Sequence, residues 1–299
     1  MVDFRGMSAF PLTPLAGDVV DFRSFVGLVE SAAAAEVDSI AALGSTGSYA
    51  YLTCAERAEI STAAVKHAGG TPVIIGVGAL RTSDVLRNVA AAEDAGASAV
   101  LLAPVTYQPL TEDEVFQLFE DVADRTQLPI IVYDNPTTTH FRFSMDLYQR
   151  IGTLPGIASL KIPGVPADPI EARRHIEAIR TILPENVTIG ISGDAFAAAG
   201  LIAGCDAWYS VIGGLFPQLA KSIAQAALTG RTGDAQMAAD RLTPLWGLFA
   251  EFGGSIRVVA AIAEQLGLAQ PNCLPRPILG LRTEDRKRVA EVVQDLALT

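Results

Sequence analysis

The chain has 299 residues, of which 50% are hydrophobic and 18% are charged, and its formal net charge is -11. This length suits one large α/β barrel, which commonly takes about 250 residues, and the apolar content excludes a disordered chain. The negative charge disfavours nucleic acid and anionic membranes as partners. A small anionic substrate would therefore need a local pocket of hydrogen-bond donors or positive charge.

The cysteines and the amino-terminal residues bear on the cellular location of the protein. Cys54, Cys205 and Cys273 are isolated thiols without a C-x-x-C pair, so neither a disulfide framework nor a cysteine-rich zinc site is indicated. The first residues lack a basic flank followed by an apolar run, and no segment offers about 18 uninterrupted apolar residues. We expect a cytoplasmic protein.

Short runs rich in β-branched residues alternate along the chain with alanine-rich segments of helical period, a pattern typical of parallel βα units. We predict strands at Gly6–Phe10, Ser39–Leu43, Pro72–Val77, Ala99–Ala103, Pro129–Tyr133, Ile157–Ile162, Val187–Ile191 and Ala207–Val211. These units could form a doubly wound open sheet. The even count of strands and the lack of a Gly-rich dinucleotide motif after the first strand favour a closed (β/α)8 TIM barrel.

Capping residues mark where several helices begin. We expect helix starts at Thr53, at Thr82-Ser83-Asp84, at Thr111 with Glu114 three positions later, and at Ser144. Each helix then returns the chain to the next strand, as a barrel requires.

After about Leu215 no strand is predicted, and four helices are expected at Pro217–Leu228, Asp234–Phe249, Ser255–Leu266 and Thr283–Leu296. Three prolines between Gln270 and Pro277 predict an extended loop, since proline cannot continue a helix. We therefore divide the chain into a barrel with the active site, residues 1–215, and a C-terminal helical appendage, residues 216–299.

Lys161 is the most informative polar residue, because it lies in the otherwise apolar strand Ile157–Ile162, near the end where barrel enzymes gather their reacting groups. A dry surrounding lowers the pKa of a lysine and leaves a free amine that can attack a ketone. A lysine that reaches solvent or pairs with a carboxylate is the structural alternative.

Two further features lie at neighbouring strand ends. Tyr133 closes the fifth predicted strand, beside the strand of Lys161, and its phenol either shuttles protons or satisfies one structural hydrogen bond. The segment Gly44-Ser45-Thr46-Gly47-Ser48 follows the second strand, and its hydroxyls and backbone N–H groups can bind a carboxylate, although such segments also form ordinary turns.

With these features in this order, the chain resembles the dihydrodipicolinate synthase and N-acetylneuraminate lyase family over nearly its whole length. The matching segments are Pro11–Pro14, Gly44–Gly47, Ala103-Pro104 with Tyr107, Tyr133–Pro136, Lys161, and Ser192–Asp194. The resemblance implies a class I aldolase, usually a homotetramer built as a dimer of dimers, that needs no metal or organic cofactor.

The resemblance also implies roles for single residues. Lys161 would hold pyruvate as a Schiff base, Tyr133 would shuttle protons, and Ser45 and Thr46 would bind the carboxylate. Thr46 would also be a catalytic residue, with Lys161 and Tyr133. The pocket floor would include Ser192 and Tyr209, and Tyr107 and Thr138 would lie in the substrate-binding region.

Several positions depart from the family pattern, mainly on the side of the second substrate. Thr138 replaces the arginine that grips aspartate semialdehyde in dihydrodipicolinate synthases, Thr106 stands where an aromatic residue is expected, and Ser48 replaces a glutamate. The residues after the lysine are Ile162-Pro163-Gly164, without acidic or hydroxyl side chains. His140 and Arg142 either replace the lost arginine or are solvated loop residues.

These departures favour a lyase or aldolase that acts on another hydroxy-2-oxo acid, such as a sugar-acid derivative. The alternatives are 4-hydroxy-tetrahydrodipicolinate synthase itself and a paralogue that binds a 2-oxo acid without turnover. A metal-dependent aldolase is disfavoured, because His67, His140 and His175 lie in separate segments without metal-ligand spacing.

Overall fold

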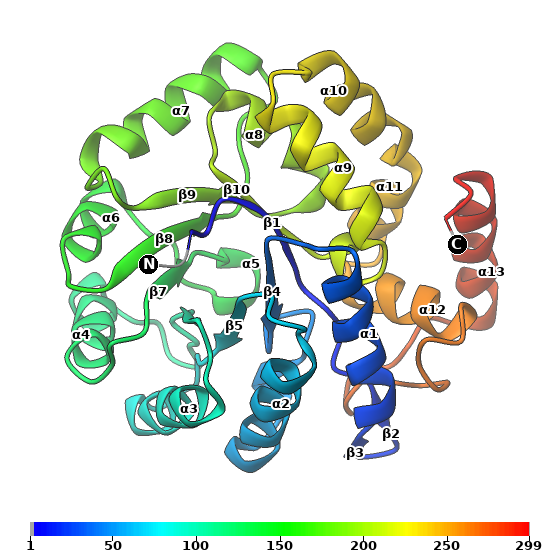
Figure 1. Cartoon of the computed structure of the whole chain (residues 1–299), viewed down its shortest axis with the longest axis horizontal. Helices are drawn as coiled ribbons and strands as arrows, with labels where there is room; N and C mark the ends of the chain where they lie inside the picture. The colour runs from blue at the N-terminus through cyan, green and yellow to red at the C-terminus, as the bar shows by residue number, and fades with distance from the viewer. Residues whose placement is uncertain (1–2, 299) are drawn as a thin grey trace.

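The computed structural model describes residues 3–298 and forms a closed barrel of parallel strands, in the order β1-β10-β9-β8-β7-β6-β5-β4 (Figure 1). The barrel strands are β1 (Gly6–Ala9), β4 (Ser39–Ala42), β5 (Val73–Gly76), β6 (Ala99–Leu102), β7 (Ile130–Tyr133), β8 (Ile157–Ile162), β9 (Thr188–Ile191) and β10 (Ala207–Ser210). The predicted TIM barrel is confirmed, and the open sheet is excluded. Each strand matches its predicted range to within one residue at either end.

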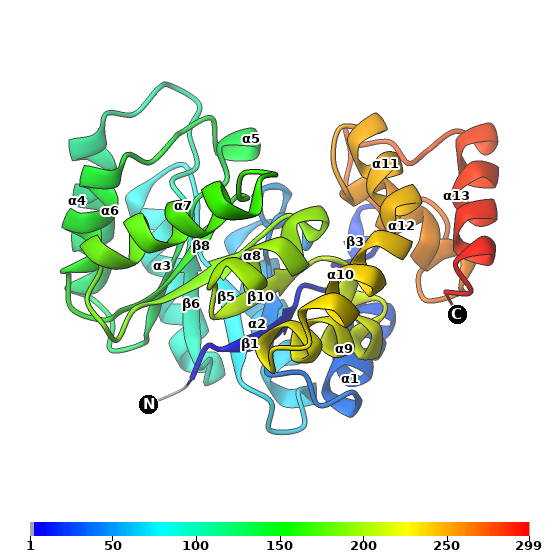
Figure 2. The ribbon, with the colours of Figure 1, turned by 90° about the horizontal axis from the view of Figure 1, so that it is seen from above.

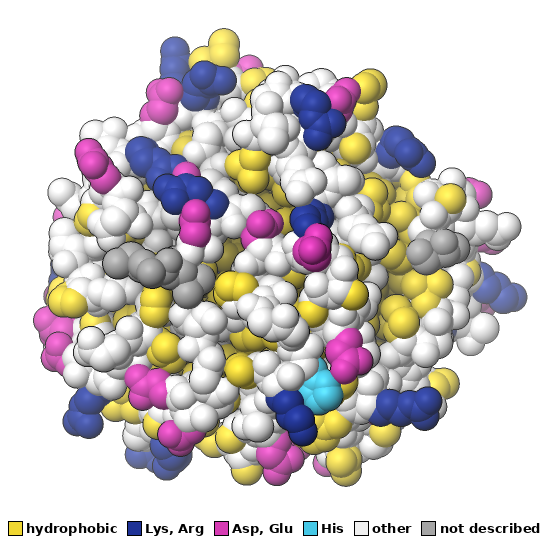
Figure 3. Space-filling model, viewed as in Figure 1, with side chains coloured by type: hydrophobic (Ala, Val, Ile, Leu, Met, Phe, Trp, Pro, Cys, Tyr) yellow, Lys and Arg dark blue, Asp and Glu magenta, His cyan; other side chains and the backbone are white. Residues whose placement is uncertain are grey.

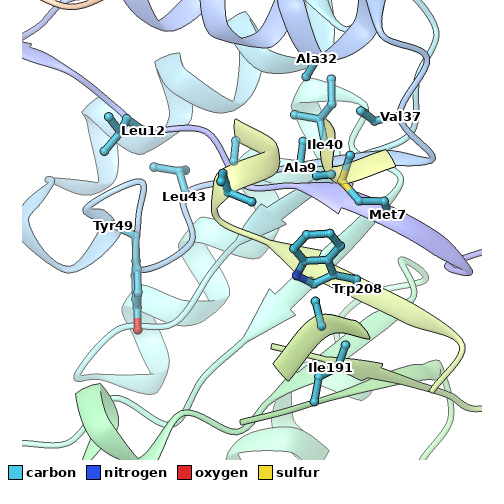
Figure 4. Close-up of a cluster of buried hydrophobic side chains, with 14 of the residues drawn as sticks. Met7, Ala9, Leu12, Ala32, Val37, Ile40, Leu43, Tyr49, Ile191 and Trp208 are labelled. Carbon is cyan, nitrogen blue, oxygen red and sulfur yellow. The ribbon is translucent and has the colours of Figure 1, made fainter. Parts of the chain in front are cut away.

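Eight helices surround the barrel, namely α1 (Phe22–Ala34), α2 (Cys54–His67), α3 (Thr82–Ala95), α4 (Glu112–Ala123), α6 (Met145–Gly152), α7 (Pro169–Ile182), α8 (Ala197–Ala203) and α9 (Pro217–Leu228). Their apolar faces bury the outward side chains of the strands, such as Met7, Ile40 and Trp208, all fully buried (Figure 4). The ring of helices extends past residue 215, because α9 packs on β1.

The remaining elements are short or lie beyond the ring. A two-stranded hairpin, β2 (Leu15–Ala16) with β3 (Val19–Val20), follows β1, and the short helix α5 (Pro136–Thr139) follows β7. Helices α10 (Thr232–Arg241), α11 (Thr243–Glu251), α12 (Ile256–Gln265) and α13 (Thr283–Asp295) follow the barrel, and Figure 2 shows α11, α12 and α13 at one side of it. A C-terminal group of helices is thus present, whereas the division at residue 215 stays a prediction.

The prediction of one helix over Asp234–Phe249 is wrong, because the segment is split at Leu242 between α10 and α11. Pro244 lies in the first turn of α11 and has no N–H to donate to the carbonyl of Asp240, so α10 cannot continue through it. The hydroxyl of Thr243 donates to that carbonyl instead, with an Oγ1–O distance of 2.7 Å.

The predicted helix starts are correct at three places. Thr53 and Thr111 form capping boxes, and the side chain of Ser144 accepts from the N–H of Leu147. Helix α3 does begin at Thr82, but Arg81 is its N-cap residue and no side chain caps it. The proline-containing segment from 270 to 277 is a loop, as predicted.

No single helix among residues 3–298 has the length and apolar composition needed to cross a membrane. Helices α11 and α12 satisfy that test only as a pair, and they are bent by 119° at the break between them. Figure 3 shows the face at which the barrel strands begin, where acidic and basic side chains are interspersed. The candidate site lies at the opposite end, where the strands finish.

Candidate active site

Lys161 points into the barrel from β8, next to the tyrosine that was predicted to lie beside it. It is paired in register with Tyr133 on β7 and with Gly190 on β9, and its exposed fraction is 3%. Side chains alternate between the two faces of a strand, so the apolar Leu160 and Ile162 face the helices while Lys161 faces the interior. The structure therefore places Lys161 and Tyr133 side by side.

Aromatic rings surround the amine of Lys161. Its Nζ lies 3.7 Å from the ring centroid of Tyr133, 4.3 Å from that of Phe10 and 5.9 Å from that of Tyr209. Ring faces of this kind attract a cation, but they offer few hydrogen bonds to replace water. The amine thus lies in a largely apolar surrounding.

Tyr209 reaches this cluster because Gly190, the residue between it and β8, has no side chain. A Cβ on Gly190 would lie 2.2 Å from Cε2 of Tyr209, so the ring occupies the space that any other residue would fill. The phenol of Tyr209 then donates to Oγ of Ser159 at 2.7 Å, and its ring meets Phe10 edge to face. These contacts fix the floor below Lys161.

Burial lowers the pKa of Lys161, while the phenol of Tyr133 and the carboxylate of Asp194 act in the opposite direction. Within residues 3–298, no carboxylate forms an ion pair with Nζ, and Asp194 is the one acid that acts on it from a distance. The structural alternative for Lys161, an ion pair or a solvated side chain, is therefore not what the fold provides. A lysine whose pKa is lowered supplies more neutral amine, which is the nucleophilic form.

Asp194 is buried between the loops that follow β9 and β10. Its carboxylate accepts from the indole N–H of Trp208 and from the backbone N–H groups of Val211 and Ile212. Burial raises its pKa to about 6, although these hydrogen bonds and the charge of Lys161 act to lower it. Asp194 thus connects the segment after β9 to β10 and to the segment that follows it.

Besides the amine of Lys161, the hydroxyl of Tyr133 has two polar neighbours. Nδ2 of Asn135 donates to it at 2.8 Å, and Oγ of Ser45 lies 3.3 Å away. Ser45 belongs to the glycine-hydroxyl loop, residues 44–48 after β4, so the structure joins this loop to the tyrosine. Thr46, the next residue, is buried with an exposed fraction of 5%.

A buried arginine supports the neighbouring strand end. Arg57 of α2 donates to the carbonyls of Gly78 and Gly76 at 2.9 and 2.7 Å, and its guanidinium lies 5.5 Å from the ring centroid of Tyr49. Because Gly76 also packs directly against the carbonyl of Leu43, this arginine helps to hold the strand end that precedes the glycine-hydroxyl loop.

A second buried acid, Asp134, follows Tyr133 on the chain. Its carboxylate accepts from the hydroxyl of Tyr148, its backbone N–H donates to the carbonyl of Lys161 at 3.0 Å, and Oδ1 has no hydrogen-bond partner among residues 3–298. Burial raises its pKa to about 6, against the hydrogen bond from Tyr148 and the charge of Arg142.

Comparisons with known proteins agree with this geometry. A model described as the dihydrodipicolinate synthetase family matches residues 3–296. This chain belongs to that family. The family expected from the sequence is therefore confirmed, and its members are class I aldolases of the lyase type.

Individual members of the family are moderately similar to this chain. It is 31% identical over 249 residues to the 4-hydroxy-tetrahydrodipicolinate synthase of Phenylobacterium zucineum (strain HLK1), covering 82% of each chain. It is 29% identical over 309 residues to that of Halorhodospira halophila (strain DSM 244 / SL1), covering 100% of this chain and 99% of the relative. The solved dihydrodipicolinate synthase from Agrobacterium tumefaciens str. C58 has 43% sequence identity, a TM-score of 0.93 and coverage of 98% of both chains.

The family resemblance pointed to four more residues, and they fall into two groups. Ser192 and Tyr209 are buried, with exposed fractions of 9% and 1%; Ser192 follows β9, which flanks the strand of Lys161, and Tyr209 lies on β10, one strand further. Tyr107 is 86% exposed and Thr138 is exposed on α5, so neither is enclosed by its own chain. Thr106 donates to the carbonyl of Thr139 at 2.8 Å, which joins the loop after β6 to α5.

Several residues of the site were missed at the level of sequence. Phe10, whose ring faces Lys161, reads as an ordinary strand residue, and Asn135 reads as a turn residue before Pro136. Asp194 was noted only as part of a motif. Period-two alternation in β1 could have placed Phe10 inside the barrel, whereas nothing local indicates the contact between Asn135 and Tyr133.

Within the part of the chain that the structure describes, no three His, Cys, Asp or Glu side chains are grouped so as to hold a metal ion. The candidate site thus consists of one buried amine, a phenol, neutral hydroxyl and amide groups, and aromatic walls.

Proposed function

We propose that this protein is a lyase or aldolase that binds pyruvate, or a related 2-oxo acid, as a Schiff base on Lys161. It would cleave or form a hydroxy-2-oxo acid, such as a sugar-acid derivative. The observation that carries the proposal is the buried amine of Lys161, 3.7 Å from the ring centroid of Tyr133 and without a paired carboxylate among residues 3–298. An amine in this setting is a nucleophile rather than a structural cation.

The chemistry follows from the two side chains. The neutral amine of Lys161 attacks the ketone carbon, and the C–N bond forms as the carbonyl oxygen takes up the proton of the Tyr133 phenol. The phenolate then takes a proton from the new ammonium nitrogen and passes it to the carbinolamine hydroxyl, which leaves as water. The resulting iminium can accept the electron pair of a breaking C–C or C–H bond. Proton transfer by a positioned group commonly contributes about 10²–10⁴-fold to the rate.

The carboxylate of the 2-oxo acid has a matching position in the loop after β4. Ser45 and Thr46 supply hydroxyl groups there, and successive backbone N–H groups of such a loop can converge on an anion. Ser45 also lies 3.3 Å from the phenol of Tyr133, so a carboxylate bound here would place the ketone close to both the phenol and Lys161. Ser192 and Tyr209 would complete the floor.

A second candidate is 4-hydroxy-tetrahydrodipicolinate synthase, which joins pyruvate to aspartate semialdehyde. The names of the relatives favour it. The exposed Thr138, in place of an arginine, and the bond from Thr106 to Thr139 favour a different electrophile. An assay of the pure protein with pyruvate and aspartate semialdehyde separates the two candidates, because robust turnover would select the synthase.

The proposed working form is a cytoplasmic homotetramer, arranged as a dimer of dimers, that needs no cofactor. Tyr107, which is 86% exposed on this chain, is a residue of the predicted site that another subunit would have to cover. Sedimentation of the purified protein tests this arrangement, and a monomer at assay concentration would contradict it.

The decisive experiment traps the Schiff base. The protein is incubated with a panel of 2-oxo acids and reduced with borohydride, and mass spectrometry then identifies the retained acid and the modified residue. We expect modification of Lys161 and none in Lys161→Ala. Trapping without turnover of any hydroxy-2-oxo acid would instead indicate a binding paralogue, and attachment at another lysine would refute the proposal.

A further inference from the structure

Asn135 directs its side chain at the phenol of Tyr133. Its Nδ2 lies 2.8 Å from Oη of Tyr133 and 3.5 Å from Oγ of Ser45, and the residue is half-buried at the end of β7. The amide therefore touches both hydroxyl groups that we place in proton transfer and carboxylate binding.

The side chain of Asn135 is free for this contact because the helix that follows does not use it. Asparagine at an N-cap usually accepts a hydrogen bond from the helix backbone. Asn135 is the N-cap of α5, yet its side chain makes no capping bond. Its backbone carbonyl holds the helix instead, accepting from the N–H groups of Thr138 and Thr139, each at 3.0 Å.

The contact between Asn135 and Tyr133 restricts the direction of the phenol proton, because each hydrogen bond needs one donor and one acceptor. The amide nitrogen can only donate, so the phenol oxygen of Tyr133 is the acceptor in this pair. The phenol proton must then point elsewhere. Among residues 3–298, Oγ of Ser45 lies within hydrogen-bond distance at 3.3 Å, and the amine of Lys161, which also interacts with the phenol, can accept its proton when neutral. The amide thereby excludes the orientation in which the phenol proton points at Asn135 and leaves those toward Ser45 and Lys161.

We propose that Asn135 is a positioning residue, whose amide fixes the Tyr133 phenol so that its proton points toward Ser45 and the bound 2-oxo acid. This inference rests on the proposed function, because it assigns Asn135 a task in the same proton transfer. It acts through Tyr133 and makes no bond to the substrate.

The test uses pyruvate alone. In D2O, the iminium on Lys161 loses a C3 proton to give an enamine and regains a deuteron from solvent, so NMR follows exchange at the methyl group. Asn135→Leu keeps the approximate volume and removes the hydrogen bonds. We expect exchange to slow about 10-fold, the effect of losing one orienting hydrogen bond. Thr137→Ala, an exposed change on the same helix, should exchange at the wild-type rate.

A second variant reverses the hydrogen bond. Asn135→Asp has the same shape but accepts instead of donating, so it would draw the phenol proton away from Ser45. Its exchange should be at least as slow as that of Asn135→Leu. If Asn135→Asp exchanged at the wild-type rate, no donor would be needed at position 135 and the inference would be overturned.

A double-mutant cycle separates positioning from a general structural effect. In a Tyr133→Phe background the phenol is absent, so Asn135→Leu should change the residual exchange rate by less than twofold. That residual rate is expected to be about 10²–10⁴-fold lower and is read over longer incubations. An equal loss in both backgrounds would show that Asn135 does not act through Tyr133.

Borohydride trapping distinguishes failure of this inference from failure of the proposed function. Wild type and Asn135→Leu should both trap pyruvate on Lys161. If wild type traps neither pyruvate nor any other acid of the 2-oxo acid panel, the proposed function is wrong. If both trap it and exchange it equally fast, the proposed function stands and the role of Asn135 is refuted.

Discussion

Replacing Lys161 with methionine should abolish turnover and stabilise the fold. Lysine and methionine side chains have similar length, but methionine has no charge to remove from water. Lys161 is 3% exposed, and its pKa is lowered chiefly by burial. Burying a polar group costs about 1–3 kcal/mol in proteins, and the rings of Phe10 and Tyr133 offset part of this through their attraction for the cation.

We therefore expect Lys161→Met to raise the free energy of unfolding by about 1–3 kcal/mol, or the melting temperature by about 2–4 °C for each kcal/mol. The gain should depend on pH. The native pKa of Lys161 lies below the 10.5 of an ordinary lysine. Between these two values the unfolded chain binds more protons, so wild-type stability rises with pH there, and the advantage of methionine shrinks.

The assay is thermal unfolding of both proteins at pH 6 and pH 9, with borohydride trapping to confirm that the variant has lost its amine. A wild type that is more stable than Lys161→Met at pH 6 would refute the reasoning. It would mean that the ammonium is solvated or paired, and that the reactive amine does not lower the stability of the fold.

Three further changes test the surroundings of Lys161. Tyr133→Phe should keep the ring packing yet lower turnover about 10²–10⁴-fold, measured as kcat, and unchanged kinetics would remove the phenol from the mechanism. Asp134→Asn should stabilise the fold by up to about 3 kcal/mol at pH 7 in urea unfolding, because burial raises the pKa of Asp134 from 3.8 to about 6. The native state binds the extra proton between those values, so wild-type stability falls as pH rises through them, and an equal gain at pH 4 and pH 7 would contradict this. Gly190→Ala should displace Tyr209 and cost about 1–3 kcal/mol, whereas Gly247→Ala, which meets nothing within 4 Å, should not destabilise.

The barrel could be predicted from sequence because each strand carries its own signal. A run such as Ile130–Tyr133 is apolar, β-branched and bounded by proline-containing turns, so its location does not depend on distant residues. The tail was less predictable at Leu242, where one proline divides a continuous helical pattern. Whether a proline kinks a helix or divides it depends on which arrangement packs better against the rest of the protein, and this is a property of the whole fold.

Lys161 and Tyr133 could be found for the same local reason, since each is a polar residue at or near the carboxyl end of an apolar strand. Asn135 could not, because its role depends on the direction of a side chain in a turn. Phe10 and Asp194 act through contacts between strands that lie far apart in sequence, and only closure of the barrel brings them to Lys161.

The site is divided between the barrel interior and its rim. Lys161, Tyr133 and Tyr209 are held by strand register and aromatic packing, so the fold itself sets the geometry that we propose for the 2-oxo acid. Thr106 lies in the loop after β6, bonded to a backbone carbonyl, and Thr138 lies exposed on α5. Neither of these two positions supplies a charge, so under the proposed function they favour a hydroxylated electrophile over one bound through its carboxylate.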